Sequence, residues 1–443
     1  MPKNSFFRSG SLALVAGLSQ QGFALIHFIF AVRWLLPEAL GTWAMFLVLV
    51  SFIDMARLGL IQNALVHFGT HKSEEKPQIF SAALSLSVGV NVAGAFILLI
   101  LSFLLKNVWQ MPDLPVLVLN YFVLAVITGI LRFAEGARMM EQDFKTSATS
   151  AFIFGFNYLL FTIILKLCNA EITGLSLLWL QIPASALTLA IVWRMNRQHL
   201  IFGHLKKEWI TKIFLYGRYA MGTNLCSMIF QRADVILLGA FVSPAALAVY
   251  NVATRIISYL DFPLNALGLA LLPKIAAEHN VSGSDGVIRL YEKSVGWLLA
   301  MTLPIALVTF FGADIIIKIM TGGKFAEAAL LVKILAVSGL VKPWGRLFGI
   351  TLDAIGKPHW NFRMLLLSMF VTIVVNLIFI PQWGIVGAAI ASALSIVLTI
   401  SIGQILLNKW LPVKVLKSFD HILPTYQSIL KKVSTRFNLN NAH

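Results

Sequence analysis

Twelve long apolar runs constrain this chain of 443 residues more than any other feature. An α-helix of about 20 residues crosses the hydrocarbon core of a bilayer. The runs are continuous and not alternating, so they predict transmembrane helices and not the strands of a β-barrel. They lie at residues 11–35, 42–66, 79–105, 115–137, 146–166, 172–193, 213–240, 246–271, 294–317, 327–350, 361–380 and 384–407.

The composition also indicates a membrane protein. The chain is 58% hydrophobic and 12% charged, with a mean hydropathy of +0.82, whereas a soluble fold is about a quarter charged. The net charge of +16 is scattered through short connections, which argues against a nucleic-acid partner. Cys168 and Cys226 lack the spacing of a disulfide framework or a metal site. We therefore predict an all-α polytopic membrane protein with about twelve transmembrane helices.

Lysine and arginine counts in the connections predict the orientation, because cytoplasmic loops are enriched in these residues. With a cytoplasmic N-terminus, the opposite side keeps only Arg33, Lys106, Lys166, Lys318 and Lys324. The cytoplasmic side then holds Lys3, Arg8, Lys72, Lys76, Arg138, Lys145, Arg194, Arg197, Lys206, Lys207, Lys212, Arg218, Lys274, Arg289, Lys293, Lys357, Arg363 and the basic tail. Both termini are thus expected in the cytoplasm. The first run lacks a clear cleavage site, which favours a retained helix over a removed signal peptide.

One long basic connection divides the chain into two sets of six runs. We expect an N-terminal six-helix bundle at 1–193, a basic cytoplasmic linker at 194–212, a C-terminal six-helix bundle at 213–407 and a basic cytoplasmic tail at 408–443. Transporters are often built from two related halves, so this division suggests an internal repeat.

A fixed offset of 207 residues aligns the two halves. It places Pro37 on Pro244, Asp54 on Asp261 and His27 on Asp234. Because each half returns the chain to the same side, the repeats would be parallel and related by a pseudo-twofold axis along the membrane normal. We expect a substrate path in a central cavity between the halves.

Ionisable residues inside the apolar runs are costly and therefore informative. Asp54 and Arg57 lie three residues apart on one helical face, so they can neutralise each other either as a structural pair or as part of a functional site. Arg132, Glu135 and Arg138 repeat this spacing. They lie near the inner end of the fourth run, where snorkelling to the cytoplasmic surface is available. We favour a structural role for Arg138, while Arg132 stays open between a structural and a functional role.

Arg232 and Asp234 cannot form such a pair, because residues two apart point about 200° from each other around a helix. At least one of them therefore needs a partner on another helix or water in a cavity. Arg255 and Asp261 are the nearest candidates along the chain. His27 is either a packed core residue or a proton-handling one.

The tenth run adds further positive charge. It carries Lys333, Lys342 and Arg346, and Pro343 predicts a kink in it. The resulting excess of cations over anions within the apolar runs suits an anionic ligand such as a phosphate.

These residues also resemble those of a known family. The stretch from Arg232-Ala233-Asp234 through Ser243-Pro244 and Tyr250 to Arg255 is similar to the seventh and eighth helices of bacterial polysaccharide transporters. These are the flippases for lipid-linked O-antigen repeat units, in the multidrug/oligosaccharidyl-lipid/polysaccharide exporter superfamily. Gly41-Thr42-Trp43 and the stretch 352–358 support the resemblance.

The resemblance implies two six-helix bundles around a cationic cavity that faces each side of the membrane alternately. The cargo would be an oligosaccharide on undecaprenyl diphosphate, moved across the bacterial inner membrane for O-antigen or capsule assembly. Contacts with other polysaccharide-assembly proteins stay open, and no cofactor is expected. The implied substrate-binding residues are Arg232, Arg255, Asp234, Asp261, Arg57, Asp54 and Arg346. The candidates for coupling to protons or sodium ions are Asp234, Asp261, Asp54 and His27.

Three alternatives are weaker. Peptidoglycan-precursor flippases of the same superfamily have fourteen spans, two more than are counted here. Cation-coupled multidrug exporters commonly carry a carboxylate in the first helix, whereas the first carboxylate here is Glu38, in a connection. A membrane polysaccharide polymerase or acyltransferase would need converging catalytic groups, and the sequence has no nucleophile with an attendant base and no phosphate-binding glycine loop.

Overall fold

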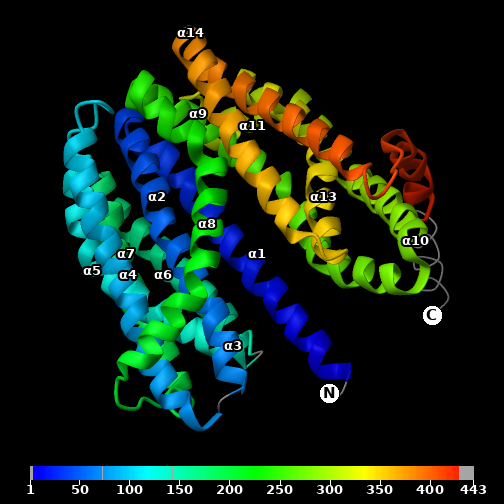
Figure 1. Cartoon of the computed structure of the whole chain (residues 1–443). Coiled ribbons are helices and arrows are strands. Elements are labelled where there is room, and N and C mark those ends of the chain that lie inside the picture. The colour runs from blue at the N-terminus through cyan, green and yellow to red at the C-terminus, as the bar shows by residue number, and fades with distance from the viewer. Residues whose placement is uncertain (1–2, 72, 142, 429–443) are drawn as a thin grey trace, which may run out of the picture. The chain divides into compact units, whose positions relative to one another are not determined.

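The regular structure of the chain is helical. The computed structural model describes residues 3–71, 73–141 and 143–428, and within these ranges it contains helices but no strand (Figure 1). The predicted all-α fold is therefore confirmed. Lys72 and the end of the predicted tail, 429–443, lie outside the described residues, as do the side chains of Lys3 and Arg8.

Contacts divide the chain into two compact units. The first unit comprises Met1–Arg232 with Val242–Ala248, and the second comprises Ala233–Phe241 with Val249–His443. The first part of the long helix α8 (Lys207–Phe241) therefore belongs to the first unit. The predicted division into functional bundles at 193 and 213 stays a prediction.

The first unit is built from helices that pack on their neighbours around one apolar core. α5 packs against α4 and α7, and α6 packs against α1 and α7. The core includes Leu60, Ile79, Phe133 and Trp209, each 1% exposed or less. The helices are α1 (Lys3–Trp34), α2 (Pro37–Arg57), α3 (Asn63–His71), α4 (Lys76–Leu105), α5 (Leu114–Met140), α6 (Lys145–Leu167), α7 (Gly174–Asn196) and α8 (Lys207–Phe241).

The predicted span at 42–66 contains an irregular turn. α2 continues through a π-helical segment, Leu58–Gln62, into α3. Such π-turns inside α-helices are rare and frequently mark functional sites.

The second unit contains two very long helices that are each interrupted. Gly283 in α10 has φ of 60° and Gly384 in α14 has φ of 55°, a backbone conformation that favours glycine. Each of these helices therefore consists of two segments. The helices are α9 (Pro244–Ser258), α10 (Asp261–Phe311), α11 (Ala313–Thr321), α12 (Ala328–Gly339), α13 (Lys342–Ala354) and α14 (Pro358–Leu407), followed by the short 3₁₀ helix Val415–His421.

The number of spans is consistent with the predicted twelve. Within the described residues, eight helices are long and apolar enough to cross a membrane, or nine if α12 and α13, which meet at 44°, form one span. The predicted run at 11–35 corresponds to α1, which is not among these eight helices. The predicted runs at 361–380 and 384–407 correspond to the two segments of α14, which are counted as one helix.

One predicted run differs from the structure, because the run at 246–271 is divided between α9 and α10. The run at 327–350 is bent between α12 and α13, beside Pro343, where a kink is predicted.

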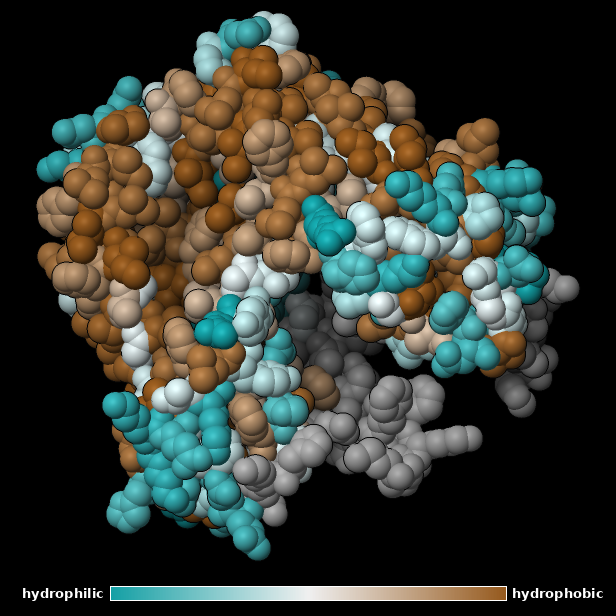
Figure 2. All heavy atoms as spheres, viewed as in Figure 1, coloured by the Kyte–Doolittle hydropathy of each residue, from teal (hydrophilic) through white to brown (hydrophobic). Residues whose placement is uncertain are grey.

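The surface is that of a membrane protein. Large apolar side chains such as Leu104 and Phe311 are 70% and 76% exposed, which lipid tolerates and water does not. In the first unit, hydrophilic side chains gather at the end where α3 ends and α8 begins, while apolar ones cover the helices above (Figure 2). This end carries the connections that are predicted to be cytoplasmic.

The orientation can be tested with reporter fusions. We expect a reporter fused after Lys207 to be cytoplasmic and one fused after Lys324 to lie on the opposite side, because lysine and arginine accumulate in the former set of connections. Paired phosphatase and fluorescent-protein fusions measure the side directly. The reverse pattern would overturn the predicted orientation.

Candidate functional site

The predicted pair in the second span forms. Arg57 Nη2 donates a hydrogen bond of 3.1 Å to Asp54 Oδ1, across one turn of α2. Arg57 is buried, at 7% exposed, and its Nε has no hydrogen-bond partner in the described part of the chain. Asp54 therefore neutralises the cation without satisfying all of its donors.

The charges on α5 extend this polar region. Arg132 Nη1 donates to Glu135 Oε2 at 2.8 Å, and Arg132 also lies within electrostatic reach of Asp54 on α2. Ser150 on α6 donates to the other oxygen of Glu135. The first unit thus brings Asp54, Arg57, Arg132 and Glu135 into one charge-balanced group.

Arg138 takes a packed position that fits the structural role favoured for it. Its side chain is buried, at 8% exposed. It forms ion pairs with Glu141, on the next turn, and with Asp143, at 2.5 Å. The two carboxylates in the connection after α5 offer a closer partner for the guanidinium than the solvent does.

The second unit places two neutral hydroxyl groups on Asp234. Tyr250 Oη on α9 donates to Asp234 Oδ2, and Ser392 Oγ on α14 donates to the same oxygen at 3.2 Å. The backbone N–H of Val235 donates to Oδ1 at 2.8 Å. Tyr250 is fully buried. Asp234 thus joins three helices of the unit through its carboxylate.

The expectation that Arg232 or Asp234 finds a partner on another helix is confirmed for Asp234. Its partners are Tyr250 and Ser392, and not Arg255 or Asp261, which are the nearest candidates along the chain. Tyr250 already belonged to the resembling stretch. Ser392 had no local signal, because it comes from a span more than 150 residues away.

Lysines of the tenth run are paired instead of free. Lys342 Nζ donates to both oxygens of Asp261, at 2.8 and 2.9 Å. Lys333 Nζ donates to the exposed carboxylate of Asp314, beyond the end of α10, at 2.7 Å. Arg346 packs beside Gly268 and makes no ion pair with any described residue. The predicted excess of cations in this run therefore reduces to Arg346.

Arg232 also has unmet bonding capacity. Its Nε is buried and has no hydrogen-bond partner in the described ranges, as is the case for Arg57 Nε. The guanidinium of Arg255 lies close enough to the Tyr259 hydroxyl to interact with it electrostatically.

His27 takes a packed position. Its ring stacks on Tyr158 of α6 at a centroid distance of 3.9 Å, and Gln181 of α7 donates to the Tyr158 hydroxyl at 3.2 Å. The buried Nε2 of His27 has no hydrogen-bond partner among the described residues. This arrangement favours the interpretation of His27 as a packed core residue. A proton-handling role for its Nε2 stays a prediction.

Comparison with protein families identifies the chain. Residues 30–330 match the family described as polysaccharide biosynthesis protein. The chain belongs to this family.

Three curated relatives have names that describe transport. The putative O-antigen transporter of Shigella flexneri is 19% identical over 413 residues, which cover 88% of this chain and 94% of that protein. The probable low-salt glycan biosynthesis flippase Agl15 of Haloferax volcanii is 24% identical over 187 residues, 41% of this chain and 39% of the relative. Over the other curated relatives that it matches, the chain likewise spans about half of their length, from 42% to 54%.

Solved structures share the fold. The lipid II flippase MurJ in an inward closed conformation superposes with a TM-score of 0.75 at 13% identity, covering 96% of this chain and 92% of MurJ. An inward-facing multidrug transporter of the MOP superfamily gives a TM-score of 0.72 at 14% identity, covering 94% and 99% of the two chains. These likenesses show that the chain shares the fold of these transporters, and the superfamily that the resemblance implied stays a prediction.

Proposed function

We propose that this protein is a flippase, and not an enzyme, that moves oligosaccharides linked to undecaprenyl diphosphate across the bacterial inner membrane. It would carry them from the cytoplasmic to the outer leaflet for O-antigen or capsule assembly, by alternating access. Family membership and the transport names of its relatives support this proposal.

One structural observation carries the proposal furthest: Arg232 has a buried guanidinium nitrogen without an acceptor among the described residues. A buried donor on a cation is costly when it has no partner. A diphosphate supplies several charged acceptor oxygens, and arginine binds phosphate oxygens in a bidentate manner. Arg346, which makes no ion pair in the described part of the chain, is a second such group.

The paired charges would have a different role from these arginines. Arg57 and Lys342 already have carboxylate partners in Asp54 and Asp261. Binding an anion there would require the cation to exchange its carboxylate for a phosphate. Such an exchange would let the cargo weaken one contact within each unit, which suits a protein that changes conformation during transport.

Asp234 is the candidate for ion coupling. Its carboxylate accepts hydrogen bonds from Tyr250, Ser392 and the backbone of Val235. Protonation would turn one acceptor oxygen into a donor, so one hydroxyl group would lose its acceptor and have to reorient. Binding of a proton or a sodium ion would thereby alter the contact between three helices.

The proposal is tested in a host strain that lacks the gene. We expect the wild-type protein to restore surface polysaccharide, while a variant with both Arg232→Ala and Arg255→Ala inserts normally but leaves lipid-linked repeat units on the cytoplasmic leaflet. Arg289→Ala, which removes an exposed arginine, is the matched control and should restore display. Normal display by the double variant would refute the assigned site.

A further inference from the structure

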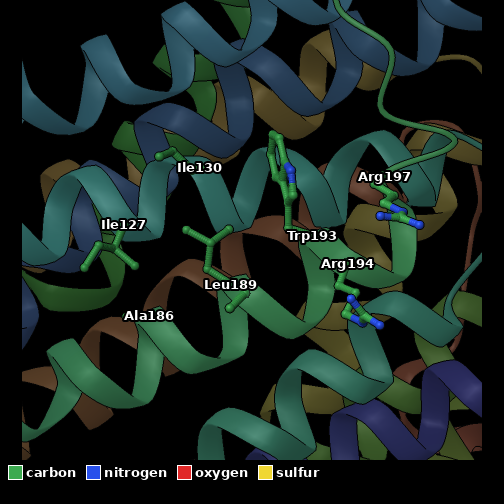
Figure 3. A pocket seen from close by; sticks show the side chains of 8 residues that line it. Ile127, Ile130, Ala186, Leu189, Trp193, Arg194 and Arg197 are labelled. Atoms are coloured by element: carbon green, nitrogen blue, oxygen red, sulfur yellow. The ribbon is translucent and has the colours of Figure 1, made fainter.

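A groove in the first unit is not used by the proposed transport site. It lies between α5 and α7 and has a volume of about 580 Å³. Ile127 and Ile130 line it from α5, and Ala186, Leu189, Ala190 and Trp193 line it from α7 (Figure 3). Its walls are thus almost entirely apolar.

One end of the groove is strongly basic. Arg194 and Arg197 lie beside Trp193 at this end, away from Ile127 and Ala186 (Figure 3). Both arginines are exposed, and neither forms an ion pair with the residues that the structure describes. Two neighbouring guanidinium groups therefore lie at one end of the apolar groove, and no carboxylate in the described part of the chain neutralises them.

This end of α7 is held firmly in place. Asn196 is 3% exposed, and it bonds to the Val192 carbonyl and to the Thr146 hydroxyl of α6. Trp193 stacks on Phe202 with ring centroids 5.7 Å apart and planes within 6°. The arginines consequently project from a fixed helix end and not from a loose loop.

We propose that the groove binds an anionic phospholipid of the cytoplasmic leaflet, with an acyl chain between α5 and α7 and the phosphate on Arg194 and Arg197. Charge complementarity selects this occupant: the groove is apolar along its length and cationic at one end, the arrangement that a phospholipid matches. Basic pockets between transmembrane helices on the cytoplasmic side bind anionic headgroups, and this end is the predicted cytoplasmic one. Tryptophan also favours the level of the headgroups. The inference is independent of the proposed transport function.

Lipid binding to the purified full-length protein tests this site. Native mass spectrometry would compare phosphatidylglycerol with phosphatidylcholine of the same acyl chains. We expect the wild-type protein to prefer phosphatidylglycerol. In the double variant Arg194→Gln/Arg197→Gln this preference should fall by about fivefold or more, because each basic residue near an anionic headgroup strengthens binding by about fivefold. Lys206→Gln/Lys207→Gln removes two exposed charges of the following connection and should keep the preference.

Two further measurements test where the acyl chain binds and which lipid occupies the groove. Leu189→Trp fills the groove without changing charge, and it should weaken phosphatidylglycerol binding while the protein stays folded. Unchanged binding in this variant, or an unchanged preference in the arginine double variant, would overturn the site. Undecaprenyl phosphate is the competing ligand, and stronger binding of it than of phosphatidylglycerol through the same arginines would overturn the assigned occupant.

Discussion

Asp234→Asn is expected to lower transport by about tenfold to a hundredfold, the range that corresponds to losing one hydrogen bond to a charged group. The amide keeps the size of the side chain but removes the charge that accepts from Tyr250 and Ser392. Restoration of surface polysaccharide in the host measures the effect. Asp285→Asn makes the same chemical change at an exposed position and should have no effect.

A purely structural role for Asp234 predicts a different outcome. In that case the thermal stability of the purified protein would fall in parallel with transport, and Asp234→Glu would restore neither. If Asp234 couples an ion, the stability loss would be small, Asp234→Glu would recover part of the activity, and the pH profile of transport would shift. Full transport by Asp234→Asn would exclude this residue as the coupling group.

Gly217→Ala is expected to destabilise the protein by about 1–3 kcal/mol, the range for inserting atoms into a packed site. A Cβ atom at Gly217 of α8 would lie 2.0 Å from the backbone oxygen of Leu60, within the π-helical turn. The backbone cannot yield as a side chain could, so α8 would have to move away. The change would also disturb the bond from Asn224 to the Met55 carbonyl.

Gly222→Ala is the matched control for this prediction. Gly222 belongs to the same helix, and nothing lies within 4 Å of a Cβ atom added there. Since alanine is a better helix former than glycine, this variant should be as stable as the wild-type protein or slightly more stable. Thermal unfolding in detergent compares the two variants. Equal unfolding temperatures would show that α8 does not rest tightly on the π-helical turn.

The all-α membrane fold was predictable because hydrophobic length alone specifies a transmembrane helix. Some breaks within the helices were also predictable. The interruption at Gly384 lies where the predicted run 361–380 gives way to the run 384–407, and the bend between α12 and α13 lies beside Pro343. The division of the run 246–271 between α9 and α10 was not predictable, because the apolar run continues across it and the backbone conformation at one or two residues decides the break.

The candidate site was only partly predictable. Asp54 and Arg57 could be paired from the sequence because they lie on neighbouring turns of one helix. The partners of Asp234 and Asp261 could not, since Ser392 and Lys342 come from distant spans and meet them only through tertiary packing. The costly charges could be identified from the sequence, but the partners that neutralise them could be identified only from the structure.

The central claim is tested most directly by reconstituting the purified protein in liposomes. A fluorescent oligosaccharide on undecaprenyl diphosphate is placed in both leaflets, and its accessibility to an external quencher is followed over time. We predict that the wild-type protein moves the labelled lipid between leaflets and that Arg232→Ala/Arg255→Ala slows this movement by about tenfold or more, as expected for the loss of charged hydrogen bonds to the diphosphate. Movement no faster than in protein-free liposomes would contradict the proposed function.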